Sequence, residues 1–65
     1  MKFVIRMLDL AVESIEEIDG RPQPVWTPTH ERALRFDSYE EAARVWRQHQ
    51  DNTTMRGAEI VPVES

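Results

Sequence analysis

The pattern of apolar positions begins with a strand over residues 2–8. Its alternating sides carry Phe3, Ile5 and Met7 on one face and Val4, Arg6 and Leu8 on the other. A period of two residues is typical of a β-strand. Because both faces are largely apolar, the pattern predicts a central strand that is covered fully on one side and at least partly on the other.

Residues 9–20 allow two interpretations. Leu8, Val12, Ile15 and Ile18 recur at helical spacing, with Asp9 available as a cap and Gly20 as a stop,. Ile18-Asp19-Gly20-Arg21 instead matches a two-residue hairpin, since a type I′ turn needs positive φ at both central residues,. Residues 21–27 would then form an edge strand whose two prolines direct their missing amides to the same unpaired side. The hairpin is the favoured interpretation and the helix the alternative.

The main helix is predicted from Ser38 to about Gln50. Ser38 and Glu41 have the spacing of a capping box, in which the serine hydroxyl and the glutamate carboxylate bond to each other's amides,. The predicted core-facing side carries Ala42, Val45, Trp46 and His49. Trp46 is therefore predicted to lie in the core.

Shorter segments complete the prediction. Thr27 and Pro28 indicate a short helical turn, with threonine as cap and proline at the first helical position,. Residues 53–57 are interpreted as a polar connection. Residues 58–63 read as a last strand, in which Pro62 marks an edge or the strand's end,.

Together these elements predict one α+β domain over residues 1–65. We expect a small antiparallel or mixed sheet of three to four strands, with one main helix (about 38–50) packed on one face. The opposite face, with Val4 and Leu8, should then be partly apolar and exposed. Such a face is typical of an interface, for example in a homodimer.

Composition narrows the chemistry. The chain has 65 residues and no cysteine, which excludes disulfides and thiolate metal sites. The two glycines cannot form a phosphate-binding loop, and Ser38 is already explained as a cap,. His30 and Glu31 are adjacent and would not face each other on a helix. We expect a protein that is not an enzyme and has no catalytic residues, cofactor, metal or small-molecule substrate.

Charge is the feature that points to a partner. The net charge is −4, and the segment 9–19 holds five acidic residues without a basic one: Asp9, Glu13, Glu16, Glu17 and Asp19. If the segment is a strand, Glu13 and Glu17 should share one face and Glu16 should lie on the other. We predict that these carboxylates contact a basic protein surface. Trp26 is a further candidate contact, although a place in the core is its favoured interpretation.

The same acidity argues against direct nucleic-acid binding, which needs a basic stripe. The N-terminal apolar run is interrupted by Arg6 and falls short of the roughly 18 apolar residues of a membrane span,. It also lacks the features of a signal peptide. We therefore expect a cytoplasmic protein without membrane contact.

The chain resembles small uncharacterised proteins of phages, prophages and bacterial genomes that share a "WT…A…F.S.EEA…VVPV" arrangement. The matching positions here are Val25-Trp26-Thr27, Ala33, Phe36-Asp37-Ser38, Glu41-Ala42 and Ile60-Val61-Pro62-Val63. The acidic segment 9–19 departs from that arrangement in being longer and more acidic. The resemblance implies a phage-type origin and, with it, an inhibitor of a host defence system of the anti-CRISPR kind. It supplies no catalytic residue.

Overall fold

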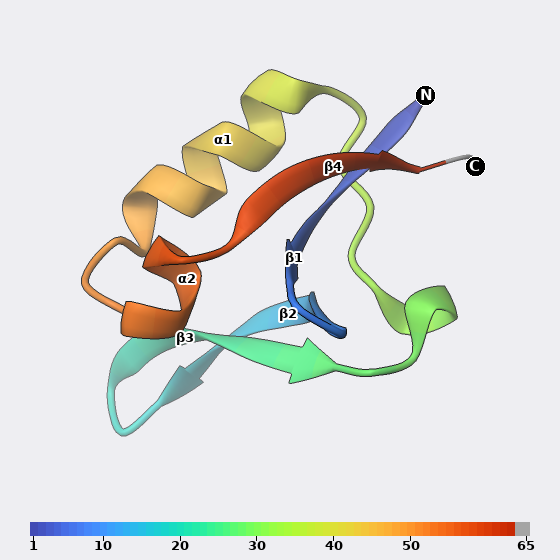
Figure 1. Cartoon of the computed structure of the whole chain (residues 1–65). Helices are drawn as coiled ribbons and strands as arrows, with labels where there is room; N and C mark the ends of the chain where they lie inside the picture. Colours follow the sequence, from blue (N-terminus) through green and yellow to red (C-terminus); the bar gives the residue numbers. More distant parts are fainter. Residues whose placement is uncertain (64–65) are drawn as a thin grey trace.

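The computed structural model describes residues 1–63, which form a four-stranded sheet with one main helix packed against it (Figure 1). The elements are β1 Lys2–Met7, β2 Leu10–Ile18, β3 Arg21–Thr27, the 3₁₀ helix η1 His30–Arg32, α1 Tyr39–Gln48, α2 Thr53–Arg56 and β4 Glu59–Val63. The strands lie in the order β3, β2, β1, β4, and all pairs are antiparallel. The predicted α+β class and the central place of β1 are confirmed.

The hairpin interpretation of residues 9–20 is confirmed and the helical alternative is wrong. Ile18 pairs with Arg21 across the turn, and the two residues between them have φ of 54° at Asp19 and 79° at Gly20. Aspartate and glycine adopt this left-handed conformation at low cost, so the turn chemistry outweighs the helical spacing of the apolar residues.

Both edges of the sheet carry proline. β3 forms one edge and contains Pro22 and Pro24, whereas β4 forms the other and contains Pro62 opposite Phe3. Proline cannot donate a backbone hydrogen bond, so it is tolerated where the missing amide faces away from the sheet. The predicted edge position of both strands is confirmed.

The main core fills the space between the sheet and the helices, on the side that we call the inner face. Its buried members are Ile5, Val12, Phe36, Ala42, Met55 and Ala58. The predicted face of α1 points into it, since Ala42 and His49 are buried and Val45 and Trp46 half-buried. The alternation of β1 places Ile5 on this side, as expected.

The opposite side, the outer face, corrects one expectation. Val4 is only 1% exposed, because it packs in a second cluster with Ala11 and Ala33. Two backbone hydrogen bonds between Phe3 and Phe36, of 2.9 and 2.8 Å, hold the segment before α1 alongside β1. The expected apolar patch of Val4 and Leu8 is therefore absent from residues 1–63. Of these two residues, Leu8 is the exposed one, at the turn between β1 and β2.

Side-chain caps begin both α-helices. The Ser38 hydroxyl accepts a hydrogen bond of 3.1 Å from the Glu41 amide, which confirms the predicted start of α1. The side chain of Asn52 accepts one of 2.9 Å from the Met55 amide and starts α2. The prediction of a polar connection over 53–57 is wrong, because Met55 gives this single turn a fully buried apolar anchor,.

The short turn after β3 begins later than expected. Thr27 ends β3, and its hydroxyl accepts a hydrogen bond of 3.0 Å from the Thr29 amide. Thr29 then occupies the N-cap of η1, which starts at His30. The predicted cap at Thr27 is wrong by two residues, since pairing with Ala11 keeps Thr27 in the sheet.

Leu8 gives a first testable prediction. It has φ of 56° and is 85% exposed, so it carries backbone strain without burying its side chain. A left-handed conformation costs most residues roughly 1–2 kcal/mol, and asparagine tolerates it better. We expect Leu8→Asn to raise the free energy of unfolding by about 1 kcal/mol in urea titrations. Leu34→Asn, at 36% exposure and negative φ, is the control and should give no increase. A loss of stability in Leu8→Asn would contradict the strain.

Candidate functional site

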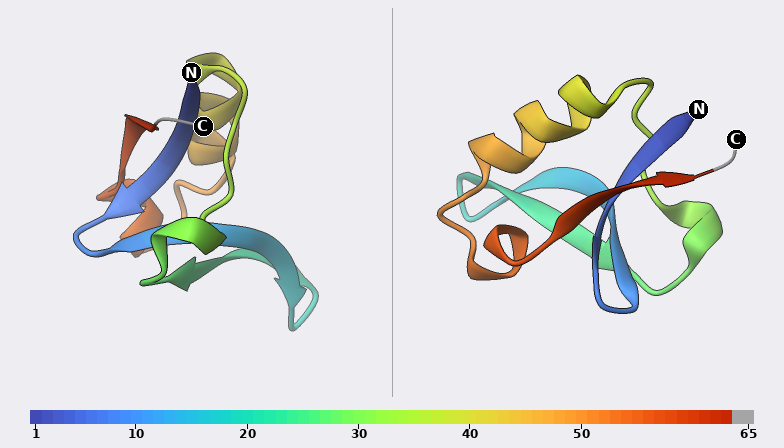
Figure 2. Two further views of the ribbon diagram at one scale, coloured as in Figure 1. Left: turned by 90° about the vertical axis from the view of Figure 1, so that its right-hand side faces the viewer. Right: turned by 45° about the horizontal axis from the view of Figure 1, so that its top comes forward.

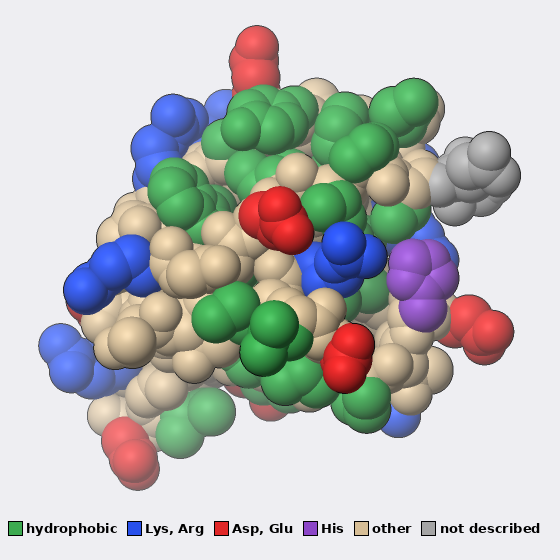
Figure 3. All heavy atoms as spheres, viewed as in Figure 1, with side chains coloured by type: hydrophobic (Ala, Val, Ile, Leu, Met, Phe, Trp, Pro, Cys, Tyr) green, Lys and Arg blue, Asp and Glu red, His purple; other side chains and the backbone are tan. Residues whose placement is uncertain are grey.

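A groove lies between α1 and β4. These two elements are on the upper side of the molecule in the view of Figure 1. Its volume is about 300 Å³, and its lining residues are Tyr39, Ala43, Trp46 and Arg47 from α1 and Ala58, Glu59 and Ile60 from the other wall. Figure 3 shows hydrophobic side chains gathered along this side, over α1 and β4. The groove thus combines an apolar floor with one aromatic side chain near each end.

The groove follows from the helical period. Tyr39, Ala43, Trp46 and Arg47 are spaced at i, i+4, i+7 and i+8, which places them along one side of α1,. This side lies next to the core-facing one, so the packing of α1 on the sheet turns it toward β4. Apart from Trp46, these residues were not predicted from the sequence, because its apolar repeat marks only the core-facing side of the helix.

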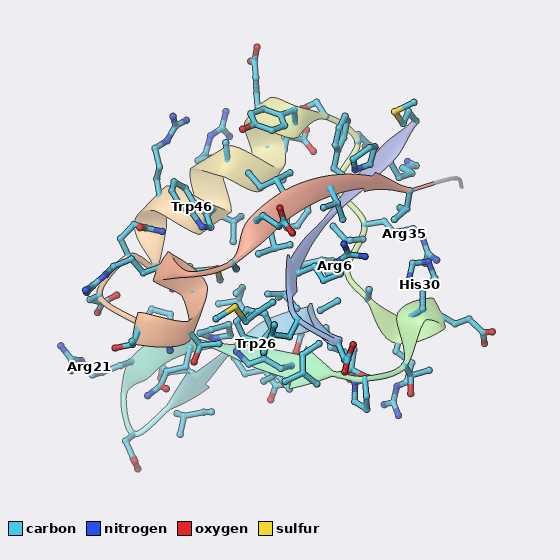
Figure 4. The ribbon with its side chains drawn as sticks, in the orientation of Figure 1. Arg6, Arg21, Trp26, His30, Arg35 and Trp46 are labelled. Carbon is cyan, nitrogen blue, oxygen red and sulfur yellow. The ribbon has the colours of Figure 1, made fainter. Side chains whose placement is uncertain are left out.

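Trp46 closes one end of the groove. Its indole Nε1 donates a hydrogen bond of 3.2 Å to the carbonyl oxygen of Ala58, just before β4 begins. Figure 4 shows the ring extending from α1 toward that segment. The ring is half-buried and packs against the main core, which confirms the core role predicted for Trp46.

Within residues 1–63, no strand pairs with the outer edge of β4. Phe3 gives both its amide and its carbonyl to Phe36, so it shares no ladder hydrogen bond with its β4 neighbour Pro62. Because antiparallel partners alternate between bonded and non-bonded pairs, Ile60 likewise directs its amide and carbonyl away from β1. The free edge of β4 therefore presents the N–H and C=O of Ile60 and the C=O of Pro62.

The acidic residues of segment 9–19 do not form one surface. A register shift between Val12 and Ser14 inserts Glu13 as the extra residue of a β-bulge,. Glu13 then lies on the outer face, where its carboxylate forms an ion pair of 3.3 Å with Arg32. Glu16 lies on the same face and accepts a hydrogen bond of 2.9 Å from the Ser14 hydroxyl. The expectation that Glu13 and Glu17 share a face is wrong, because the bulge reverses the alternation.

The other three acidic residues are further apart. Asp9 is exposed in the turn between β1 and β2, at the opposite end of β2 from Asp19. Glu17 and Asp19 are exposed at the tip of the β2–β3 hairpin, which projects from the rest of the molecule in the left view of Figure 2. Ile18 lies between them and is 44% exposed. At the tip, Glu16, Glu17 and Asp19 are thus exposed close in sequence to one exposed apolar residue, with Glu16 and Glu17 on opposite faces of β2,.

Trp26 packs toward the core. It pairs with Val12 across β2 and β3, and its half-buried ring packs against the main cluster on the inner face. Of the two interpretations from the sequence, the structure therefore gives it a core position.

Among the ionisable groups of residues 1–63, Asp37 has a shifted pKa. The Lys2 ammonium donates a hydrogen bond to the Asp37 carboxylate, and this bond with the attached positive charge lowers the pKa of Asp37. The pair links β1 to the segment before α1. Within residues 1–63, no three histidine, aspartate or glutamate side chains form a group that could hold a metal ion. No helix in the same range is long and apolar enough to cross a membrane.

Comparison of this chain with protein-family models, with curated proteins and with solved structures gives no match.

Proposed function

We propose that this protein is a non-catalytic interaction module that binds an extended segment of a partner protein in the groove between α1 and β4. The observation that carries the proposal is the groove itself, which places two aromatic rings and small apolar residues beside an open strand edge. Strand addition to a sheet edge is a recurrent mode of peptide recognition, in which backbone bonds give affinity and adjacent pockets give specificity.

A second candidate surface is the acidic tip of the β2–β3 hairpin. Its support is the projection of Glu16, Glu17 and Asp19 around Ile18, which suits a basic protein surface with an apolar hollow,. This is the proposed form of the acidic contact expected from segment 9–19. An inhibitor of a host defence system remains a proposal of the same kind, since a module that occludes a basic surface would act through such a tip.

The two surfaces can be separated by selecting binders from a displayed library of random peptides. We expect the selected peptides to bind the wild-type protein and to lose at least tenfold in affinity for Tyr39→Ala, because this ring is exposed at the groove,. The triple variant Glu16→Gln, Glu17→Gln, Asp19→Asn is the matched control and should bind them normally. The opposite result, with strong salt dependence, would move the site to the hairpin tip and overturn the groove.

A further inference from the structure

The open edge of β4 is short and has a defined end. At the N-terminal end of β4, the outward carbonyl of Ala58 already accepts a hydrogen bond from the Trp46 indole. The Ala58 amide donates a hydrogen bond of 3.0 Å to the carbonyl of Met55. At the other side Pro62 has no amide to donate. An added strand therefore finds one donor and one acceptor at Ile60 and one acceptor at Pro62.

This pattern fits a short antiparallel strand. The carbonyl of the ligand residue opposite Ile60 can accept a hydrogen bond from the Ile60 amide, and the amide of that ligand residue can donate one to the Ile60 carbonyl. The amide of the ligand residue two positions earlier can donate to the carbonyl of Pro62. Tyr39 and Arg47 are eight positions apart on α1, or about 12 Å along the helix, which matches three to four extended residues at about 3.4 Å each,. Pairing cannot continue past Ile60, because the indole of Trp46 stands at Ala58.

Charge decides the direction of the strand. Arg47 lines the groove at its Trp46 end, and within residues 1–63 it forms no ion pair. Glu59 lines the groove too, but it lies directly opposite Arg6 of β1, so a cross-strand neighbour of opposite charge offsets its carboxylate,. A strand antiparallel to β4 brings its C-terminal end to Arg47, whereas a parallel one would bring its amino end to a like charge.

We propose, on the basis of the function proposed above, that the groove binds the free C-terminal tail of a partner protein. The last residue of the tail pairs with Ile60, so its side chain shares the inner face and enters the apolar floor at Ala43,. Its carboxylate accepts hydrogen bonds from the Ile60 amide and the Arg47 guanidinium. The preferred last residue is aliphatic or aromatic, since Ala43 on one wall and Ile60 on the other give its side chain apolar surface.

A second copy of this chain suits the edge less well. Two β4 strands that pair about Ile60 would share only the two hydrogen bonds between these residues, because Ala58 is already bonded in each copy. A tail whose last residue pairs with Ile60 makes three backbone hydrogen bonds to β4, and its carboxylate also contacts Arg47.

The test uses hexapeptides with randomised last residues, displayed with free C-termini, and the full-length protein. The best peptide is then synthesised as the free acid and as the C-terminal amide. We expect the amide to bind at least tenfold more weakly to the wild type, because hydrogen bonds to charged groups are the stronger ones. In Arg47→Gln this difference should shrink to about twofold or less. Arg44→Gln, an exposed arginine on the same helix, is the control and should keep the full difference.

A backbone readout accompanies the affinities. The amide of Ile60 should become protected from hydrogen exchange when the free acid binds. Equal binding of acid and amide, or an unchanged ratio in Arg47→Gln, would overturn the C-terminal tail while leaving the groove intact, provided that Tyr39→Ala still weakens binding. If Tyr39→Ala has no effect, the groove itself is not the site. Protection of Ile60 that rises with protein concentration, without peptide, would identify a second copy and overturn the proposal.

Discussion

Met55→Ala is expected to lower the free energy of unfolding by about 2–5 kcal/mol, the usual cost of removing a fully buried methionine side chain. Met55 is 0% exposed and belongs to the main core, although it comes from a helix of only four residues. The total free energy of unfolding of a domain of 65 residues is roughly 3–10 kcal/mol,. The variant should therefore lose a large part of its stability, which a clear fall in the urea midpoint and in Tm would show.

The control for Met55 lies one position earlier. Thr54 is exposed in the same short helix, so Thr54→Ala should change stability by no more than about 0.5 kcal/mol,. Urea unfolding followed by tryptophan fluorescence measures both variants, because Trp26 and Trp46 pack against the cluster that contains Met55. Equal stability of the two variants would mean that α2 does not anchor the chain before β4.

Trp46→Ala is the second substitution with a large expected effect, a loss of roughly 2–4 kcal/mol, somewhat below the range for a fully buried tryptophan. The ring contributes packing against the core and the hydrogen bond from Nε1 to the Ala58 carbonyl. Trp46→Phe separates the two contributions, since phenylalanine retains most of the packing but cannot donate. We expect it to cost about 1 kcal/mol, the typical net value of one hydrogen bond.

Thermal and urea unfolding measure this series, with Arg47→Ala as the control because its side chain is exposed at the next position. Trp46→Phe has a further consequence for the groove. It frees the Ala58 carbonyl, which gives an added strand one more acceptor at the end where pairing now stops. If Trp46→Phe were as unstable as Trp46→Ala, the hydrogen bond would outweigh the packing and the division of roles would be wrong.

Local sequence signals predicted most of the fold. The alternation in residues 2–8 led to the central strand, Asp19-Gly20 to the hairpin, and Ser38 with Glu41 to the start of α1. Each of these depends on backbone geometry within a few residues. The polar residues around Met55 concealed α2, because one buried side chain per helical turn leaves no repeated pattern to detect.

The candidate binding surfaces were harder to predict. The acidic segment was correctly placed in a strand and a hairpin tip, but the bulge at Glu13 moved one carboxylate to the outer face and into an ion pair with Arg32. A bulge depends on the register between two strands, which neither strand specifies alone. For Trp26 the sequence favoured the core and left a binding contact as the alternative, and the pairing with Val12 and the packing of the ring decided for the core.

By itself the sequence determined the class of the fold, the turn at Asp19-Gly20 and the cap at Ser38, because these follow from periodicity and from local backbone preferences. Only the tertiary structure decided which surfaces are open. Packing of Ala33 beside Val4 closed the outer face, and the approach of α1 to β4 created the groove. The edge position of β4 left the outward amide and carbonyl of Ile60 without a strand partner within residues 1–63. The closed outer face and the groove both result from contacts between residues far apart in the chain, where the free energy depends on how the elements pack together.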